Sequence, residues 1–520
     1  MKKLISIAVI LFAIMLYTLT LRGSLGNPSI KQIDTTLKEY SQPFESSHER
    51  SPFALIMSLD RDKKFDLSRD LADIGAPDVS YHEGKFYSFF PIGLPLLLYP
   101  SYELGKITLG TQIMTFGTIA LFAVISVYLV FLITKNIFKV KSHFAILAAL
   151  IFGFGTTSWS YAITIYQHIP STMLFLLMFY SGWKYKAQKK ASIVWASLIW
   201  ISYGILIAMD YPNAIMGLPL MIYFFLNSFS VPKTTSKTST PVRFSLLIVV
   251  SSIFFIGLIG SHLYFNYKQY GGPTLIPQSF DRYERDKYYQ LLGSIKAREQ
   301  KQKISVVTKK TDSTLEESRS IIGSYILLFD NDKGIFFYSP ILIIALLGYW
   351  TLFKKQKTRE AYVLLLMAVV NLFVYSSFGD PWGGWAYGPR YLIPAMAFLS
   401  IAVVIGLNSI QKKIQYYITA FITFIFFAYS SGVALLGALT TNIIPPKVEA
   451  IPLKLKYYNY FQNFDYLKNG YTSNYIYNAY LRSSISLYAY FFIIWGILLT
   501  IALILLFIVP MFKKNHESDN

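Results

Sequence analysis

Long apolar runs separated by short polar connections set the pattern of this chain. Each run is close to the ~20 apolar residues that a helix needs to cross the hydrocarbon core of a bilayer. The pattern therefore predicts an all-α polytopic membrane protein with about twelve transmembrane helices. We expect these spans at about residues 4–22, 112–134, 143–161, 166–183, 191–208, 213–229, 244–266, 337–353, 361–378, 391–407, 415–440 and 489–512.

Net positive charge falls almost entirely on alternate connections between the predicted spans. The positive-inside rule assigns this face to the cytoplasm, and an even number of spans puts both termini there. The opposite, extracytoplasmic face has long and nearly charge-balanced loops, at about 23–111, 267–336 and 441–488. We therefore expect the protein to act on the extracytoplasmic side of the cell membrane. The Lys/Arg-rich connections lie near residues 2–3, 135–141, 184–190, 233–243, 354–359, 412–413 and 513–514.

Composition narrows the classes of function. The chain is 54% hydrophobic and 17% aromatic, with a mean hydropathy of +0.42, which excludes an ordinary soluble globular protein. The topology explains most of the net charge of +20, so we expect the lipid bilayer and no nucleic acid as a partner. The chain has no cysteine, which excludes disulfides and thiolate-bound metals. No A-x-A-like cleavage site follows the first apolar run, so we interpret it as a retained helix.

The long outer loops contain segments that are not simple turns. Residues 45–59 read as an acidic strip that opens into a short interfacial helix. Residues 86–104 are apolar but interrupted by three prolines, which favours an interfacial or re-entrant segment. The charged stretch 281–303 predicts a surface helix or a flap. We divide the chain into a transmembrane catalytic domain, 1–440, and a Tyr/Asn-rich outer loop with the last helix and a cytoplasmic tail, 441–520.

Carboxylates are concentrated in the first outer loop. Glu45 and Glu49 lie in the acidic strip, and Asp78 precedes the proline-interrupted segment. A carboxylate at a membrane surface beside an apolar wall can have a raised pKa and act as a general base. Most of these carboxylates are equally well explained as solvated groups.

Ionisable residues at the outer ends of spans form a second group of candidates. His168, Asp210 and Arg390 lie on one predicted face, where unpaired polar groups are costly. Arg390 suits bidentate phosphate binding, although an arginine here can also snorkel to lipid phosphates, and a lone histidine is more often structural. Trp382 and Trp385 flank two glycines in a turn that fits either an aromatic belt or a sugar contact.

Five segments between about residues 45 and 400 resemble, in the same order, the motifs of one known superfamily. They are ESSHERSPFALIMSLDRDKKFDL, GKFYSFFPIGLPLLLYPSYELG, YQHIPSTMLFL, NYKQYGGPTL with DNDKGIFFYSPILIIALLG, and WGGWAYGPRYLIPAMAF. Together they resemble the C-type (GT-C) membrane glycosyltransferases, in particular the branch of protein O-mannosyltransferases and lipid A aminoarabinose transferases.

The resemblance implies a fold and a reaction. The fold is a helical membrane domain with a cavity at its outer face. In the reaction, a polyprenyl- or dolichyl-phosphate sugar donates its glycosyl group, with inversion, to an extracytoplasmic protein, lipid or glycan. A carboxylate of the first outer loop acts as general base, and basic residues hold the departing lipid phosphate. The family base is commonly an Asp, whereas this chain offers Glu49 first, Glu45 second and Asp78 third.

The resemblance also implies substrate-binding residues. No cofactor is certain; some relatives use a divalent metal, for which Glu45, His48 and Glu49 would be the ligands. The substrate-binding candidates are Arg390, His168, Lys85, Asp210, Trp382, Trp385, Tyr87 and Arg50.

Two other classes of function compete with the transferase. A transporter, flippase or polymerase of polyprenyl-linked glycans is the main alternative, and a structural or assembly protein is the second. A transporter predicts internal repeats and polar residues at the midplane of the membrane. The chain has no visible repeat, and its polar candidates lie at the outer rim. It also has no P-loop, H-E-x-x-H, G-x-S-x-G or Rossmann pattern, which argues against a nucleotide-driven pump or a serine hydrolase.

Overall fold

The spanning helices form one bundle. The computed structural model describes residues 2–35, 44–187, 192–230, 243–244, 246–285, 317–355 and 358–511. Within them the protein is the all-α polytopic type that the sequence predicts, and each predicted span coincides with one helix or with two consecutive helical pieces. These helices are α1 (Lys2–Thr20), α6 (Thr111–Asn136), α7 (Ser142–Phe154), α9 (His168–Ala187), α10 (Ser192–Met209), α11 (Asn213–Met216) with α12 (Leu218–Ser228), α13 (Leu246–Ser251) with α14 (Ile253–Tyr270), η3 (Pro340–Ile344) with α18 (Ala345–Lys355), α19 (Arg359–Ser376), η4 (Arg390–Leu392) with α20 (Ile393–Asn408), α21 (Lys413–Leu439), and α24 (Leu487–Leu503) with η6 (Ile504–Ile508).

Length and composition identify the protein as an integral membrane protein. In the described part of the chain, eight helical segments are long and apolar enough to cross a membrane. Three shorter apolar helices lie at Ser142–Phe154, Asn213–Ser228 and Pro340–Lys354. The remaining predicted span corresponds to α9, a 20-residue helix that ends in a basic turn.

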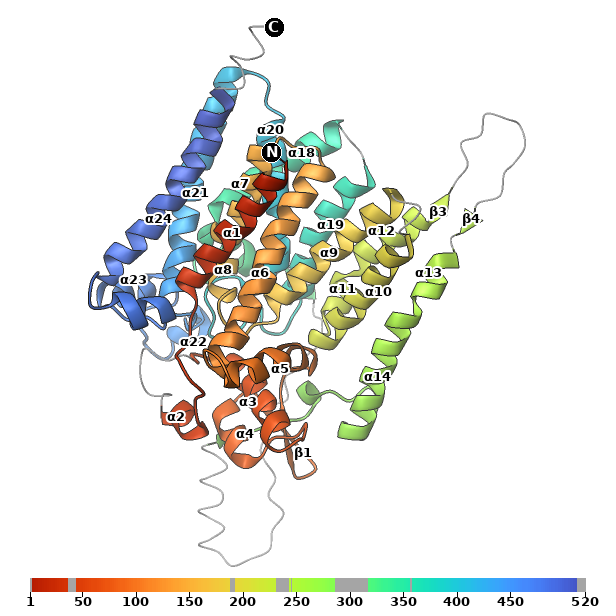
Figure 1. Ribbon diagram of the computed structural model, residues 1–520, viewed down its shortest axis with the longest axis vertical. Coiled ribbons are helices and arrows are strands. Elements are labelled where there is room, and N and C mark those ends of the chain that lie inside the picture. The colour runs from red at the N-terminus through yellow and green to blue at the C-terminus, as the bar shows by residue number, and fades with distance from the viewer. Residues whose placement is uncertain are drawn as a thin grey trace, which may run out of the picture.

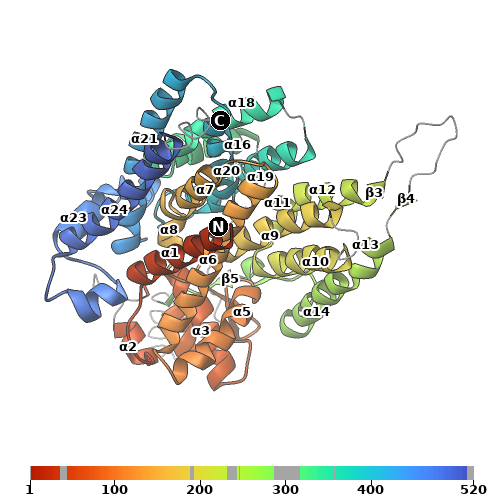
Figure 2. The same cartoon turned by 45° about the horizontal axis from the view of Figure 1, so that its top comes forward.

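Burial separates central helices from peripheral ones. In the apolar stretch of α20, 83% of the residues are buried inside the protein, against 17% for α13–α14 and 28% for α1 and α24. α20 packs against α7, α18 and α19, whereas α13–α14 and α24 lie at opposite edges of the bundle (Figure 1 and Figure 2). The exposed apolar side chains of these peripheral helices therefore face lipid.

A layer of short elements covers one end of the bundle, opposite the end where α1 begins and the last helix finishes (Figure 1). We call residues 44–110 the α3–α5 layer. Its sheet has the order β2-β1-β5, with β1 antiparallel to both neighbours, so that Ser80 pairs with Tyr87 and with Arg282. The elements at this end are α2 (Ile30–Thr35), α3 (Ser47–Arg61), α4 (Arg69–Gly75), β1 (Val79–His82), β2 (Lys85–Ser88), α5 (Gly93–Lys106) and β5 (Asp281–Arg282).

The proline-interrupted segment forms α5, which packs against α6 and α10 in this layer. Gly93, at the first position of α5, allows the closest approach. A Cβ atom on Gly93 would lie 2.5 Å from the carbonyl oxygen of Ala208, too close for any side chain. The sequence predicted the interfacial helix after Glu45 and the segment that becomes α5, but it did not predict the small sheet.

The other two outer segments contain only short elements. The predicted surface helix or flap at 281–303 begins with β5, and its part beyond residue 285 lies outside the described residues. In the third segment, short helices follow α21 and lead into α24. The remaining described elements are α8 (Ser158–Tyr161), β3 (Phe229–Ser230), β4 (Arg243–Phe244), η2 (Pro277–Ser279), α16 (Glu317–Leu328), α17 (Ile335–Tyr338), α22 (Lys447–Ala450), α23 (Phe461–Lys468) and η5 (Tyr477–Leu481).

Candidate active site

The first turn of α3 buries Glu49. Ser46 is the N-cap, and its side chain accepts a hydrogen bond from the Glu49 amide at 3.3 Å. In return, Glu49 Oε2 accepts from the amides of Glu45, at 2.7 Å, and Ser46, at 3.3 Å. This reciprocal capping box satisfies amides that the helix itself leaves free. The other oxygen, Oε1, accepts from the hydroxyl of Thr164 at 2.6 Å, so Glu49 is fully enclosed.

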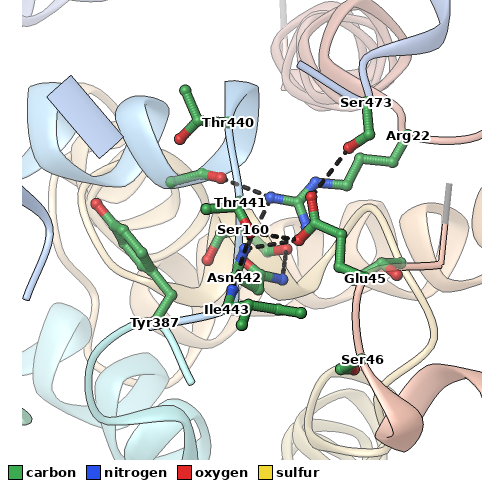
Figure 3. Close-up of polar contacts among 12 residues, drawn as sticks. Arg22, Glu45, Ser46, Ser160, Tyr387, Thr440, Thr441, Asn442, Ile443 and Ser473 are labelled. Atoms are coloured by element: carbon green, nitrogen blue, oxygen red, sulfur yellow. Dashed lines mark hydrogen bonds and ion pairs between the residues drawn. The ribbon is translucent and has the colours of Figure 1, made fainter. Parts of the chain in front are cut away.

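Glu45, just before the helix, is held by an arginine from the end of the first span. Arg22 Nη1 lies 2.9 Å from Glu45 Oε2, and both side chains are almost completely buried. Figure 3 shows the guanidinium and the carboxylate facing each other, with the segment that follows α21 alongside. The same oxygen accepts from Thr441 Oγ1 at 3.0 Å and from the Asn442 amide at 2.7 Å. Oε1 accepts from Ser473 Oγ at 3.2 Å.

The enclosure of Glu49 changes its proton affinity. Burial and, secondly, the charge of Glu45 raise the pKa of Glu49 to about 7. The Thr164 hydrogen bond and the charge of Arg22 act in the opposite direction. Glu49 is thus poised to exchange a proton near neutral pH, which is the range that favours general acid–base chemistry.

An aromatic layer lies beside these carboxylates. The hydroxyl of Tyr166 is 2.9 Å from Ser46 Oγ, and its ring stacks on His48 with centroids 4.5 Å apart. His48 Nε2 lies 2.7 Å from Gln167 Oε1. Burial, followed by the nearby charge of Arg390, lowers the pKa of His48 well below its usual range, so this imidazole is neutral.

Arg390 lies on the far side of this layer. Its Cζ is 5.5 Å from the ring centroid of Tyr166 and 5.3 Å from that of Tyr391. Gly383, with φ +68°, leaves room for it, because a Cβ there would lie 3.0 Å from Arg390 Nε. Among the described residues, Nε of Arg390 has no hydrogen-bond partner although it is buried, and no ion pair joins Arg390 to a carboxylate. Arg390 as a whole is half-buried, so its guanidinium is a partly enclosed cation with aromatic neighbours and no ion pair among the described residues.

His168 and Asp210 complete this side of the site. The ring of His168 lies 5.8 Å from that of Tyr391, and its buried Nε2 has no hydrogen-bond partner in the described part of the chain. Asp210 accepts from the hydroxyl of Tyr375 at 3.3 Å, and Tyr375 stacks on Tyr391 with centroids 4.3 Å apart. Burial raises the pKa of Asp210 to about 6.

Two predicted residues lie in the α3–α5 layer next to the carboxylates. Asp78 accepts from Ser47 Oγ at 2.7 Å, and its nearest cation is Arg282, at 3.9 Å. Arg50 donates to the carbonyl of Ile74 at 2.8 Å, so it ties α3 to α4. Asp78 thus remains in reach of the site, whereas Arg50 has a structural contact.

The other predicted residues lie on β2 and in the turn that precedes Arg390. Lys85 is exposed on β2, and Tyr87 donates to the carbonyl of Gln269 at 3.1 Å, at the end of α14. Trp385 is exposed and donates from its indole nitrogen to Glu449 at 2.6 Å. Trp382 is half-buried in the same turn.

Sequence reasoning did not identify the residues that surround Glu45. Arg22, Thr441, Asn442 and Ser473 come from two segments that are more than 400 positions apart. One signal was available for Arg22. It directly follows the first span on the outer face, where an arginine at a span end is a candidate for a paired or functional charge. Among the described residues, no group of three or more His, Cys, Asp or Glu side chains is arranged to hold a metal ion.

No protein-family model and no curated protein matches the chain. Among solved structures, the apo oligosaccharyltransferase of Archaeoglobus fulgidus matches with a TM-score of 0.47 and 12% identity, over 86% of this chain and 57% of that one. ArnT from Cupriavidus metallidurans, bound to undecaprenyl phosphate, matches with a TM-score of 0.45 and 13% identity, over 97% of this chain and 77% of that one.

Both matches are C-type glycosyltransferases, the class that the sequence motifs resemble. This chain spans little more than half the length of the archaeal enzyme. Both of these TM-scores are below 0.5.

Proposed function

We propose that this chain is an integral membrane glycosyltransferase. It moves a sugar from a polyprenyl- or dolichyl-phosphate donor to an acceptor hydroxyl on the extracytoplasmic side, with inversion at the anomeric carbon. The α3–α5 layer faces that side, and both termini are cytoplasmic.

The observation that carries this proposal is the unpaired cation at Arg390. Burying a charge without a counter-ion is costly, and proteins normally avoid it. Arg390 Nε and His168 Nε2 are both buried without hydrogen-bond partners among the described residues, and both side chains lie against Tyr391. A phosphate would supply the negative charge and the acceptor oxygens that these nitrogens lack. The phosphate of a lipid-linked sugar reaches this position from the membrane, because Arg390 opens a spanning segment.

The general base lies among the three carboxylates at the start of α3, and burial distinguishes them. Glu49 has no exposed surface, whereas the side chains of Glu45 and Asp78 are 9% and 15% exposed. Glu45 also has one oxygen, Oε1, that accepts a single hydrogen bond among the described residues, from Ser473 at 3.2 Å. We therefore assign the base to Glu45, with Glu49 second and Asp78 third. Ser473, which contacts Glu45 Oε1, also lines a cavity of about 220 Å³ with Gly23, Ser24 and Tyr475.

The reaction balances with these groups alone. The acceptor hydroxyl gives its proton to Glu45 Oε1 while its oxygen bonds to the anomeric carbon of the donor. The bond between that carbon and the phosphate oxygen breaks, and its electron pair leaves on the phosphate. Arg390 and His168 stabilise the charge that develops there. Tyr166 lies between the base and this phosphate position, since it contacts both Ser46 and Arg390.

The proposal is tested in membranes from cells that express the wild-type chain, Glu45→Gln or Arg390→Met, each given a set of radiolabelled polyprenyl-phosphate sugars. We expect wild type to transfer label to an endogenous acceptor, and Glu45→Gln to bind the donor without transferring. Lys85→Met is the matched control, because Lys85 is exposed on β2. Movement of intact labelled lipid between leaflets without sugar transfer would mean that the protein is a flippase and not a glycosyltransferase. Full activity of Glu45→Gln would move the base to Glu49 or Asp78.

A further inference from the structure

Arg22 is one of the most completely buried charged side chains in the described structure. Its Nη1 donates to Glu45 Oε2 at 2.9 Å. Its Nη2 donates to the carbonyl of Gly437 at 2.6 Å and to Asn442 Oδ1 at 3.3 Å. One planar guanidinium therefore joins the end of α1, the residue before α3 and the end of α21 (Figure 3).

Asn442 closes the same arrangement from the other side. Its amide donates to Glu45 Oε2 at 2.7 Å, and its side-chain nitrogen donates to the carbonyl of Ser160 at 2.9 Å. With Thr441, this brings three donors to a single carboxylate oxygen, Oε2, while Oε1 receives one bond, from Ser473. These bonds hold the carboxylate in one orientation, and Oε1 is the oxygen that accepts fewer hydrogen bonds.

We infer that Arg22 is a positioning residue for the proposed transfer. It orients Glu45 so that Oε1 is directed at the acceptor, and it ties this carboxylate to the outer segment that follows α21. The inference rests on the proposed function, since it gives Glu45 the role of base. Arg22 itself touches neither the donor nor the acceptor.

The chemistry of arginine fits this role better than that of lysine. A guanidinium offers several donors in one rigid plane, so it can hold Glu45, Gly437 and Asn442 in a fixed relation. A lysine would keep the charge but would lose this geometry. Misplacement of a reacting group by about 1 Å can cost roughly 100-fold in rate. An arginine that fixes the orientation of the base can therefore contribute strongly to the rate.

The same contact has an electrostatic consequence. Arg22 compensates the charge of Glu45, and Glu45 lies next to Glu49, whose cap it shares. The charged and titratable groups that face this pair are Arg22 from the end of α1, His48 and Arg50 from α3, and Tyr161 and Tyr166 from the segment between α7 and α9. Of the cations, Arg22 alone is within 4 Å of a carboxylate oxygen of the pair in the described residues. The charge of Arg22 holds the pKa of Glu49 down, so without it Glu49 should keep its proton to higher pH.

The test compares wild type, Arg22→Gln and Arg22→Lys in the transfer assay, with kcat and the donor KM measured across pH. For Arg22→Gln we expect kcat to fall roughly 100-fold with the donor KM within about twofold, because the phosphate site is separate. We also expect the acidic limb of the pH profile to move upward by about one unit or more. Arg22→Lys should restore the position of that limb but only part of kcat. A merely structural arginine would move neither the limb nor the ratio of kcat to KM.

Two controls separate folding from orientation. Arg61→Gln removes an exposed arginine of the same layer, which pairs with Asp62 and Asp70, and should leave kcat and the profile unchanged. Melting temperatures give a readout that needs no activity. Arg22→Gln should lower the melting temperature more than the double variant Arg22→Gln/Glu45→Gln does, because the single variant leaves a buried carboxylate uncompensated.

The outcomes distinguish this inference from the proposed function. If wild type transfers sugar and Arg22→Gln retains both kcat and the wild-type profile, the positioning role is wrong and the proposed function stands. If wild type transfers nothing from any donor, the proposed function fails and the role of Arg22 in transfer fails with it. If the double variant melts below the single variant, Arg22 does not compensate the charge of Glu45. The ion pair on which the positioning role rests is then wrong, and the inference fails with it.

Discussion

The guanidinium of Arg390 lies over the ring of Tyr166, with Cζ 5.5 Å from the ring centroid. The hydroxyl of the same tyrosine is 2.9 Å from Ser46 Oγ, at the start of α3. One aromatic side chain therefore separates a half-buried cation, which has no ion pair among the described residues, from the two carboxylates at the start of α3. This arrangement lets the two opposite charges coexist without neutralising each other, which is what a transfer between a phosphate leaving group and an acceptor hydroxyl requires.

Arg390→Lys should weaken the binding of polyprenyl phosphate. Lysine keeps a positive charge but loses the planar pair of donors, and a charge-assisted hydrogen bond is worth about 1.5–3 kcal/mol, which corresponds to roughly 10- to 100-fold in Kd. Titration of the purified chain in lipid nanodiscs with a fluorescent polyprenyl phosphate measures this. Lys85→Met, on the exposed strand β2, should leave Kd within about twofold. An unchanged Kd for Arg390→Lys would mean that the phosphate binds elsewhere.

Tyr166→Phe should separate the two contacts of this ring. The variant keeps the aromatic face beneath Arg390 and loses only the hydroxyl contact with Ser46. We expect a loss of about 1 kcal/mol in the free energy of unfolding, typical of one hydrogen bond, and donor binding close to that of wild type. Unfolding in denaturant together with the same titration gives both quantities. A large loss of donor affinity would show that the hydroxyl itself reaches the phosphate.

Glu49→Gln should change how stability depends on pH. The pKa of Glu49 is about 7 in the folded protein and about 4.3 in an unfolded chain. The folded state therefore binds more protons than the unfolded state between these values, and stability falls as pH rises from about 4.3 to about 7. The total is on the order of 4 kcal/mol for this group.

Glutamine can retain the capping box, so this variant should fold. Its melting temperature should fall less between pH 5 and pH 7.5 than that of wild type. Equal slopes in the two proteins would show that Glu49 is ionised throughout this range and would contradict its burial as a group of raised pKa.

Lys333→Met should loosen the turn that carries Arg390. Lys333 is fully buried, donates to the carbonyl of Ala386 in that turn, and lies 3.4 Å from Asp332. Burial lowers the pKa of Lys333, with Asp332 acting against this. Removing the cation leaves Asp332 buried without its partner, which typically costs about 3–5 kcal/mol. Thermal unfolding should record this loss, and the double variant Lys333→Met/Asp332→Asn should recover part of it. No recovery would mean that Lys333 acts through Ala386 alone.

The sequence predicted the helical architecture well, because membrane spans depend on local hydrophobicity. All twelve predicted spans coincide with helices, and the helix after Glu45 begins at Ser47 with the capping pattern Ser46-x-x-Glu49. The small sheet was not predicted, because β1 and β5 come from segments about 200 residues apart and are only a few residues long.

The candidate site was predicted in part. The structure places His168, Asp210 and Arg390, predicted at the outer ends of spans, and Glu45 and Glu49, predicted in the acidic strip of the first outer loop, at one end of the bundle near Tyr166 and Tyr391; their roles stay predictions. The surroundings of Glu45 were not accessible in this way. Its contacts to Arg22, Asn442 and Ser473 join the two ends of the chain and follow from tertiary packing alone.

The most direct test of the central claim follows the donor bond itself. The purified chain, reconstituted in nanodiscs with a polyprenyl-phosphate sugar that is labelled in both the sugar and the phosphate, is mixed with membrane extract as a source of acceptor. The account predicts one polyprenyl phosphate released for each sugar transferred, an inverted anomeric configuration in the product, and neither product from Glu45→Gln. Retention of the anomeric configuration, or recovery of intact donor while glycan moves across the membrane, would contradict it.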